Sequence, residues 1–187
     1  MSDGPITLPN TSLTQSAWLA QLRQISDELK SGSDRAVAIV GVALLDEMLR
    51  QALEAMFHPT LSVRDRADLF EGPAAALGTY ASRTRMARAL GLFQDNFQKD
   101  LRLLGRVRNR FAHDLAVTSF EEPGIAGLCE QLLGYRTEHI ARDGTATPWV
   151  EWRSGKDARQ AFIATITSAV YLLMIFLNTK GLIRSDA

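Results

Sequence analysis

Residues 161–177, AFIATITSAVYLLMIFL, form a run of 17 residues without a charge. A helix that is apolar on every side must be covered by the rest of the fold, by another subunit or by lipid. A membrane span needs about 20 predominantly apolar residues, whereas this run is shorter and contains Thr165, Thr167 and Ser168. Basic residues lie on both sides of it, so its flanks carry no orientation signal. We therefore predict a central or interface helix and no membrane association.

The rest of the chain has the composition of one helical domain. The chain is 187 residues long and 46% apolar, which is enough for a single core. Apolar residues recur at helical spacing nearly throughout, and no strand pattern of useful length occurs. We predict an all-α fold, a single-domain helical bundle of about six to seven helices over residues 13–187. Residues 1–12 are rich in turn formers, and we predict a mobile arm there.

The predicted elements follow the apolar periodicity and the signals that start and stop helices. We expect Ser33 or Asp34 to cap the second helix, and Pro59 to end it near the sequence FHP. Ser82 is expected to cap the helix RTRMARALGL. The stretch 142–155 is predicted to be a loop or a short hairpin. The other predicted helices span residues 13–30, 64–69, 94–113, 121–139 and 156–179.

Charge and cysteine content narrow the classes of function. Lys+Arg and Asp+Glu number 21 each, so the overall charge demands neither a nucleic acid nor a membrane as partner. A single cysteine, Cys129, permits no internal disulfide and fits a reducing compartment, and we expect a cytoplasmic protein. His58 and His139 are isolated, so we expect no metal site. Phosphate-loop, dinucleotide and nucleophile-elbow motifs do not occur, and we expect no cofactor.

The segment 105–114, GRVRNRFAHD, places several arginines at the end of a predicted helix. Each residue of an α-helix advances by about 100°. An apolar stripe that enters the core is therefore expected from Leu104, Val107, Phe111 and Leu115. The opposite, polar face is expected from Arg102, Arg106, Asn109 and His113, with Arg110 at its border.

The basic character of this helix extends towards the N-terminus. From Arg83 to Arg110 there are eight Lys or Arg against two Asp, a net of +6. Such a surface can hold an anion or steer a polyanion, and it can equally meet an acidic patch of a second subunit or be a solvated face. The candidate binding residues are Arg83, Arg102, Arg106, Arg110 and Tyr80.

Several of these residues also have a structural interpretation. Asn109 and His113 are four apart, and they form either a buried polar pair that satisfies loop backbone groups or part of a functional site. We expect Arg83 to pair with Asp46 or Glu47 of the second helix rather than with a ligand. Tyr80 is expected in the core or at an interface rather than as a platform for stacking.

The stretch LFEGPAAALGTYASRTRMARALGLFQDNFQKDLRLLGRVRNRFAH resembles the mannitol operon repressor family. The resemblance covers roughly residues 35–115. Its matching features are Gly78, Tyr80, Arg83, the run Leu90-Gly91-Leu92 and the segment from Val107 to His113. This resemblance implies an all-helical fold and a role in transcription regulation. The family lacks an obvious helix-turn-helix, and we find none in this sequence.

The same segment is similar to the signature of the HEPN superfamily, in which an arginine and a polar residue precede a histidine. Arg108, Asn109 and His113 have the spacing of that signature. In catalytic members, as the resemblance implies, arginine and histidine from two subunits meet and cleave RNA without a metal. A histidine can move the proton of a 2′-hydroxyl while an arginine holds the scissile phosphate.

The sequence is therefore compatible with two functions. The favoured one is a non-enzymatic regulator of transcription that acts through a protein partner, because the longer pattern matches it. The alternative is a metal-independent ribonuclease or toxin component that uses Arg108, Asn109 and His113 as catalytic residues. We expect a homo-oligomer in either case, because the apolar final helix exceeds what one small bundle covers. Nucleic-acid binding is expected to be weak and insensitive to sequence at most.

Overall fold

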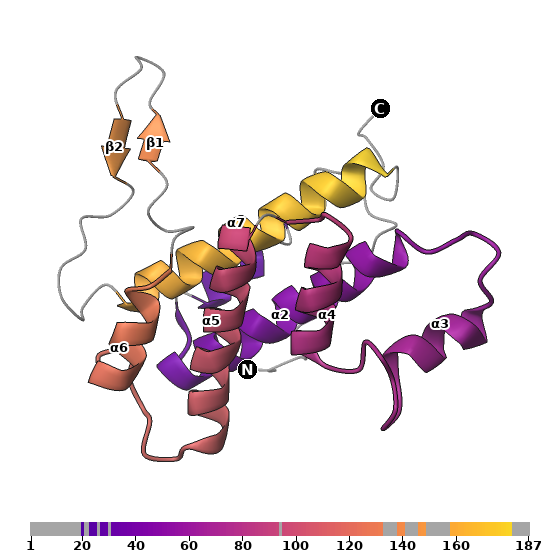
Figure 1. Cartoon of the computed structure of the whole chain (residues 1–187). Helices are drawn as coiled ribbons and strands as arrows, with labels where there is room; N and C mark the ends of the chain where they lie inside the picture. The colour runs from indigo at the N-terminus through magenta and orange to yellow at the C-terminus, as the bar shows by residue number, and fades with distance from the viewer. Residues whose placement is uncertain are drawn as a thin grey trace.

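A computed structural model describes residues 20, 23–25, 27–29, 31–93, 95–132, 138–140, 146–148 and 158–180. It is a single helical domain, as predicted (Figure 1). The expected arm 1–12 lies outside the described residues. The helices are α2 Asp34–Glu54, α3 Val63–Phe70, α4 Tyr80–Ala89, α5 Asp95–His113, α6 Pro123–Cys129 and α7 Ala158–Thr179. The strands β1 Glu138–Ile140 and β2 Ala146–Pro148 form an antiparallel pair, with His139 opposite Thr147.

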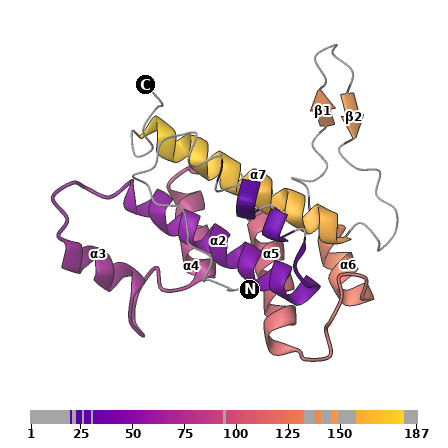
Figure 2. The same cartoon turned by 180° about the vertical axis from the view of Figure 1, so that it is seen from behind.

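The two longest helices, α2 and α7, form the centre of the bundle and run in the same direction. Asp34 at the start of α2 forms an ion pair with Arg159 at the start of α7, at 3.2 Å. Further along, a Cβ atom added at Gly41 would lie 2.7 Å from Cδ1 of Ile166. The absence of a side chain at Gly41 therefore lets the two helices approach closely. Helical residues before α2, including the buried Leu29, lie against this crossing (Figure 2).

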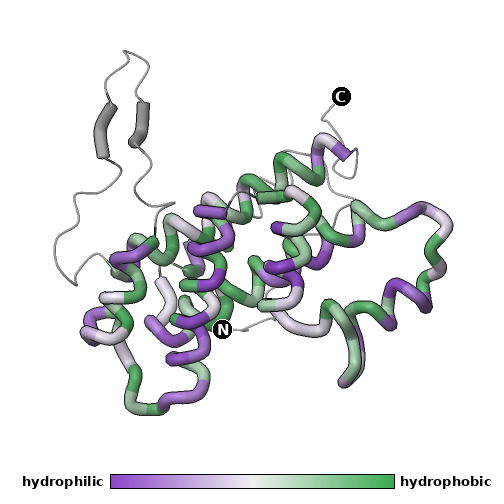
Figure 3. The backbone as a smooth tube through the Cα atoms, viewed as in Figure 1, coloured by the Kyte–Doolittle hydropathy of each residue, from purple (hydrophilic) through white to green (hydrophobic). Residues whose placement is uncertain are grey.

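Helix α7 is only partly the buried central helix that its sequence predicts. One side of it is buried and includes Phe162, Ile166, Val170 and Leu173. Its length and composition would also allow it to cross a membrane, but half of its most apolar window is buried in this fold. The exposed fractions of Tyr171, Leu172 and Ile175 are 49%, 48% and 42%. An apolar stripe is thus left on the surface of a helix that is hydrophobic along most of its length (Figure 3).

The first turn of α2 holds the end of α5 in place. The Arg35 guanidinium donates to the backbone carbonyl oxygens of Phe111, Leu115 and Val117, the last at 2.7 Å. The Phe111 oxygen lies in the last turn of α5, where backbone acceptors have no intrahelical partner, and the other two oxygens follow the end of the helix. Ser33 caps α2 as predicted, with its side chain accepting from the amide of Ala36. Next to these hydrogen bonds, the Phe120 ring packs against the rings of Phe111 in α5 and Phe162 in α7, and all three rings are buried in the core.

Helices α4 and α5 form an antiparallel hairpin with well-defined ends. Helix α4 begins earlier than predicted, because its N-cap is Thr79 and not Ser82. The side chain of Thr79 accepts from the amide of Ser82, and that of Ser82 accepts from the amide of Thr79, a reciprocal capping box. At the other end Gly91 has φ of +76°, and the amide of Leu92 donates to the carbonyl of Ala87 at 2.9 Å. This pattern is a Schellman motif, which requires a glycine-like conformation.

Two further predictions about the elements are wrong. The helix predicted over 121–139 ends at Cys129, and β1 occupies 138–140. Strand β2 lies within the stretch 142–155 and pairs with β1, which precedes that stretch, so the hairpin alternative is correct but the hairpin begins earlier than predicted. Leu115 does not extend the buried stripe of α5, since it is 85% exposed. Helix α5 ends at His113, so the helical phase that placed Leu115 on the buried side no longer holds.

Candidate functional site: an arginine-lined cavity between α4 and α5

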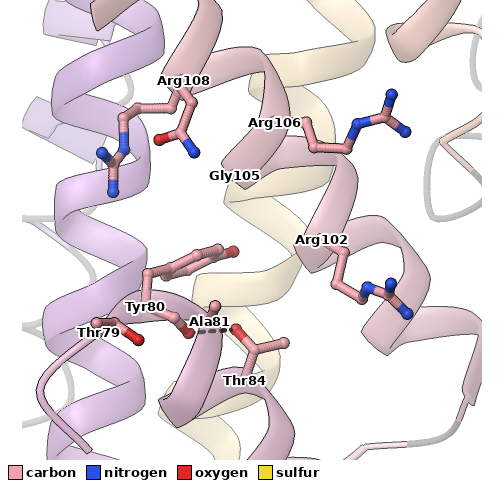
Figure 4. A pocket seen from close by; sticks show the side chains of 9 residues that line it. Thr79, Tyr80, Ala81, Thr84, Arg102, Gly105, Arg106 and Arg108 are labelled. Atoms are coloured by element: carbon pink, nitrogen blue, oxygen red, sulfur yellow. Dashed lines mark hydrogen bonds between the residues drawn. The ribbon is translucent and has the colours of Figure 1, made fainter. Parts of the chain in front are cut away.

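A cavity of about 360 Å³ lies where the first turn of α4 faces the middle of α5 (Figure 4). Its lining residues are Thr79, Tyr80, Ala81, Thr84, Arg102, Gly105, Arg106, Arg108 and Asn109. Three of the nine are arginines and none is acidic. The volume is that of a pocket for a small ligand.

Tyr80 and Gly105 shape the cavity together. A Cβ atom at position 105 would lie 2.9 Å from Cε1 of Tyr80, so the ring packs directly on the backbone of α5. The Tyr80 hydroxyl donates to the carbonyl oxygen of Leu101 at 2.9 Å. Burial raises the pKa of Tyr80 and the charge of Asp46 raises it further, which keeps the phenol neutral. Tyr80 is thus a buried part of the cavity wall, as the sequence predicts.

The arginines stand on both sides of Gly105. Arg108 is half-buried and extends towards Thr79, whereas Arg102 and Arg106 are exposed and project outward on the opposite side (Figure 4). No ion pair or hydrogen bond joins these three guanidinium groups to any residue that the structure describes. Several other arginines of the described residues are paired, for example Arg88 with Asp95. The cavity therefore concentrates positive charge that the described part of the fold leaves uncompensated.

The N-terminus of α4 adds backbone donors to this charge. The capping box engages the amides of Thr79 and Ser82, but not those of Tyr80 and Ala81 between them. Amides in the first turn have no intrahelical acceptor. Both residues line the cavity. A helix N-terminus favours negative charge, so it acts in the same sense as the three arginines.

Among the predicted binding residues, Tyr80, Arg102 and Arg106 meet at this cavity, and Arg83 and Arg110 do not. Arg83 is instead a structural residue. It forms an ion pair with Asp46, one of the two partners expected from the sequence, at 2.8 Å. Its Nε also donates to the carbonyl oxygen of Leu77 at 2.8 Å. Its guanidinium carbon also lies 5.6 Å from the centre of the Phe70 ring. Arg110 is exposed and lies 3.5 Å from Asp114.

The residues of the RNA-cleavage signature are only partly brought together. Arg108 and Asn109 line the cavity, but His113 does not. Arg108 and His113 are separated by about 140° around α5 and about 7.5 Å along it, so one chain does not bring them together. Asn109 and His113 are both exposed. The interpretation of these two as a buried polar pair is therefore wrong, because no described element covers this face of α5.

Four further residues line the cavity and are not among the candidates that the sequence indicates: Thr79, Ala81, Thr84 and Gly105. Two signals were available. Thr79 and Ser82 have the spacing of a capping box, which marks the start of a helix. Gly105 interrupts an otherwise strongly amphipathic helix, and such a glycine usually has a packing or functional reason. Neither signal indicates which helix faces the glycine.

Fold and cavity together define an all-helical domain with a cationic pocket at a helix–helix contact. Within the ranges that the structure describes, no group of three His, Cys, Asp or Glu could hold a metal ion.

One solved structure has a similar fold: a chain of the MtlR–HPr complex from Escherichia coli, determined by X-ray crystallography. The TM-score is 0.61 at 18% sequence identity, and the match covers 81% of this chain and 97% of that chain. No protein-family model matches this sequence, and no curated protein matches it. The chain therefore has an MtlR-like fold.

Proposed function

We propose that this protein is a cytoplasmic regulator of transcription that acts by binding a protein partner. The observation that carries the proposal is the match over 97% of a chain whose structure was solved in complex with HPr. The family resemblance of residues 35–115 supports the same role. Regulation through a partner needs no helix that reads DNA, in agreement with the lack of a helix-turn-helix in the sequence.

The exposed basic side of α5 is the surface we assign to the partner. Lys99, Arg106, Arg110 and His113 are exposed and lie within a sector of about 60° on the helix. Charge complementarity steers association and selects partners. We therefore expect the partner to present an acidic surface to this side of α5. Nucleic acid would bind the same residues weakly and with steep salt dependence, because only phosphate contacts are offered.

Isothermal titration with HPr from the same organism tests the proposal. The variant Lys99→Glu/Arg110→Glu reverses two charges outside the cavity, and Arg64→Glu/Arg85→Glu is the control with the same change in net charge. We expect the first to weaken HPr binding at least about tenfold and the control to change it less than about twofold. Absence of HPr binding to the wild-type protein, or equal losses in both variants, would contradict the proposal.

A ribonuclease activity remains the second candidate, because His113 is open to solvent on the basic side of α5. Since Arg108 lies on another side of the helix, a catalytic pair would require residues from two copies. The test is cleavage of single-stranded RNA in the presence of a chelator. Under our proposal the wild-type protein gives no cleavage; cleavage that disappears in His113→Ala would establish the ribonuclease instead.

We also propose that the protein is a homodimer and that the α7 stripe is its interface. Tyr171, Leu172 and Ile175 are large apolar residues on consecutive turns of one helix, each more than two-fifths exposed. Apolar patches of this kind mark interaction sites. A second copy that presents the same stripe would cover it, as in the isologous interfaces of most homodimers.

A further inference from the structure

We propose that the cavity between α4 and α5 binds the phosphoryl dianion of a small metabolite, a phosphate monoester or phosphate itself. This site shares Arg106 with the partner surface assigned above, but its other lining residues lie outside that surface, and the inference goes beyond the proposed regulatory role. The observation behind it is the placement of Arg102, Arg106 and Arg108 around one cavity without a counter-ion among the described residues.

The charge of the cavity is unusual for this chain. Arg102 and Arg106 are four apart on α5, a spacing at which like charges destabilise a helix. Several arginines elsewhere in the described fold make structural contacts: Arg83 pairs with Asp46, and Arg50 with Glu54 at 3.1 Å. A set of arginines that is left unpaired around a cavity is what an anion site requires, because the ligand supplies the missing negative charge.

A phosphoryl group fits this cavity better than a carboxylate. A carboxylate carries one charge and is satisfied by a single bidentate arginine, whereas three arginines flank this site. A phosphate monoester has close to two charges near neutral pH and three terminal oxygens. These oxygens can accept from Arg108, from the Asn109 amide and from the free amides at the start of α4, and the outward-pointing Arg102 and Arg106 can close over them. Helix N-termini are ready-made phosphate sites.

The ligand is small and its remaining part is weakly recognised. The Tyr80 ring packed on Gly105 closes one wall of the cavity, which excludes a long polymer from that side. The hydroxyl groups of the lining already donate within the fold. The Tyr80 hydroxyl donates to the carbonyl oxygen of Leu101, the Thr84 hydroxyl to the backbone carbonyl oxygen of Tyr80, and the Thr79 hydroxyl to Oγ of Ser82. Few polar groups are therefore left for the rest of the ligand. Recognition rests on the phosphoryl group.

Titration calorimetry on the full chain tests the proposal at pH 8, with inorganic phosphate, glycerol phosphate and phenyl phosphate as probes. Sodium chloride at the same ionic strength controls for screening. We expect at least one phosphoryl probe to bind at one site per chain. Its affinity should fall as the pH is lowered through the second pKa of the phosphoryl group, which is about 6 for a monoester. A monoester that binds more tightly than inorganic phosphate identifies a metabolite as the ligand; equal affinities identify free phosphate.

Arg108→Gln and Arg85→Gln form a matched pair of variants. Both remove one arginine charge, but Arg85 is exposed on α4 and outside the cavity. We expect Arg108→Gln to weaken phosphoryl binding at least about tenfold and Arg85→Gln to change it less than about twofold. Circular dichroism verifies that both variants are folded. Lack of saturable binding by all three probes, or equal effects of the two variants, would overturn the proposal. HPr binding is measured separately, so a failure here leaves the proposed regulatory role intact.

Discussion

Position 105 determines whether α4 and α5 can meet as they do. Alanine is favoured over glycine inside a helix by about 1 kcal/mol. Here that preference competes with the Tyr80 ring, whose Cε1 would lie 2.9 Å from the added methyl group. The ring cannot move without disturbing its buried hydrogen bond to Leu101. The steric effect therefore outweighs the helix propensity.

We expect Gly105→Ala to lower the free energy of unfolding by about 1 to 2 kcal/mol, the usual cost of overpacking. Gly127 in α6 is the control, because a methyl group there would meet no atom within 4 Å. Gly127→Ala should stabilise the protein by up to about 1 kcal/mol through helix propensity. Urea denaturation of both variants measures the difference. A Gly105→Ala protein as stable as Gly127→Ala would show that Tyr80 moves freely.

Substitution of His113, unlike that of Gly105, is expected to leave the stability nearly unchanged. It is exposed, at the end of α5, and no hydrogen bond to it occurs within the described part of the chain. Exposed substitutions away from structural contacts change stability by less than about 0.5 kcal/mol. His113→Ala should therefore leave the melting temperature nearly unchanged, which corrects the loss of stability that a buried polar pair implies. Differential scanning calorimetry measures the melting temperatures of the wild-type and His113→Ala proteins. A clear drop in the variant would contradict this expectation and would indicate that His113 contacts residues outside the described ranges.

At the scale of elements, the ends of helices are held by residues distant in sequence. Arg35, in the first turn of α2, satisfies backbone oxygens at and after the end of α5. Its neighbour Asp34 accepts from the amide of Phe120 at 2.9 Å and pairs with Arg159 of α7. The start of α2 therefore joins α5, α7 and the 114–122 loop.

Removal of the Arg35 guanidinium should lower the free energy of unfolding. Arg35→Met retains most of the aliphatic side chain but leaves the carbonyl oxygens without their donor, and hydrogen bonds to charged groups contribute about 1.5 to 3 kcal/mol. We expect the free energy of unfolding to fall by about 2 to 3 kcal/mol on that basis. Arg64→Met, at an exposed position of α3, serves as the control and should have little effect. Chemical denaturation compares them, and equal stability of the two variants would mean that water replaces Arg35.

At the scale of the whole molecule, the surface of α7 decides the state of assembly. The apolar stripe Tyr171, Leu172 and Ile175 faces solvent in the single chain. Such a stripe is costly to leave in water, since buried apolar area is worth roughly 25 cal/mol per Å². Another large apolar residue, Leu115, is exposed in isolation after α5 and needs no such cover.

We expect a dimeric mass for the wild-type protein by light scattering at micromolar concentration. Leu172→Lys should shift the mass to that of a monomer, because it places a charge in the centre of the proposed interface. Leu115→Lys should leave the dimer unchanged, as it adds the same charge elsewhere. A monomeric wild-type protein, or a dimer that tolerates Leu172→Lys, would rule out this interface.

Local patterns in the sequence determined most of the helices and several of their ends. The periodicities that predict α2, α5 and α7 and the cap at Ser33 depend on residues within about one turn of each other, so they can be found without the fold. The stop signal at Pro59 lies beyond the observed end of α2, which is Glu54. The Schellman end at Gly91 is equally local. Prediction failed where local signals compete. Ser82 has the residue type of an N-cap, but it is the third residue of α4 and its side chain accepts from the amide of the true N-cap, Thr79. The apolar residues of 121–139 are compatible with more than one structure.

Only the tertiary structure decided which polar faces are covered and which are open. The sequence placed Arg102, Arg106, Asn109 and His113 on one side of α5, yet whether that side is buried depends on where α2, α4 and α6 pack. Those positions are set by contacts between residues far apart in the chain, such as Arg35 with Phe111 and Tyr80 with Gly105. Helical periodicity repeats every 3.6 residues and carries no information about such partners. The cavity, the structural role of Arg83 and the exposure of His113 therefore followed from packing.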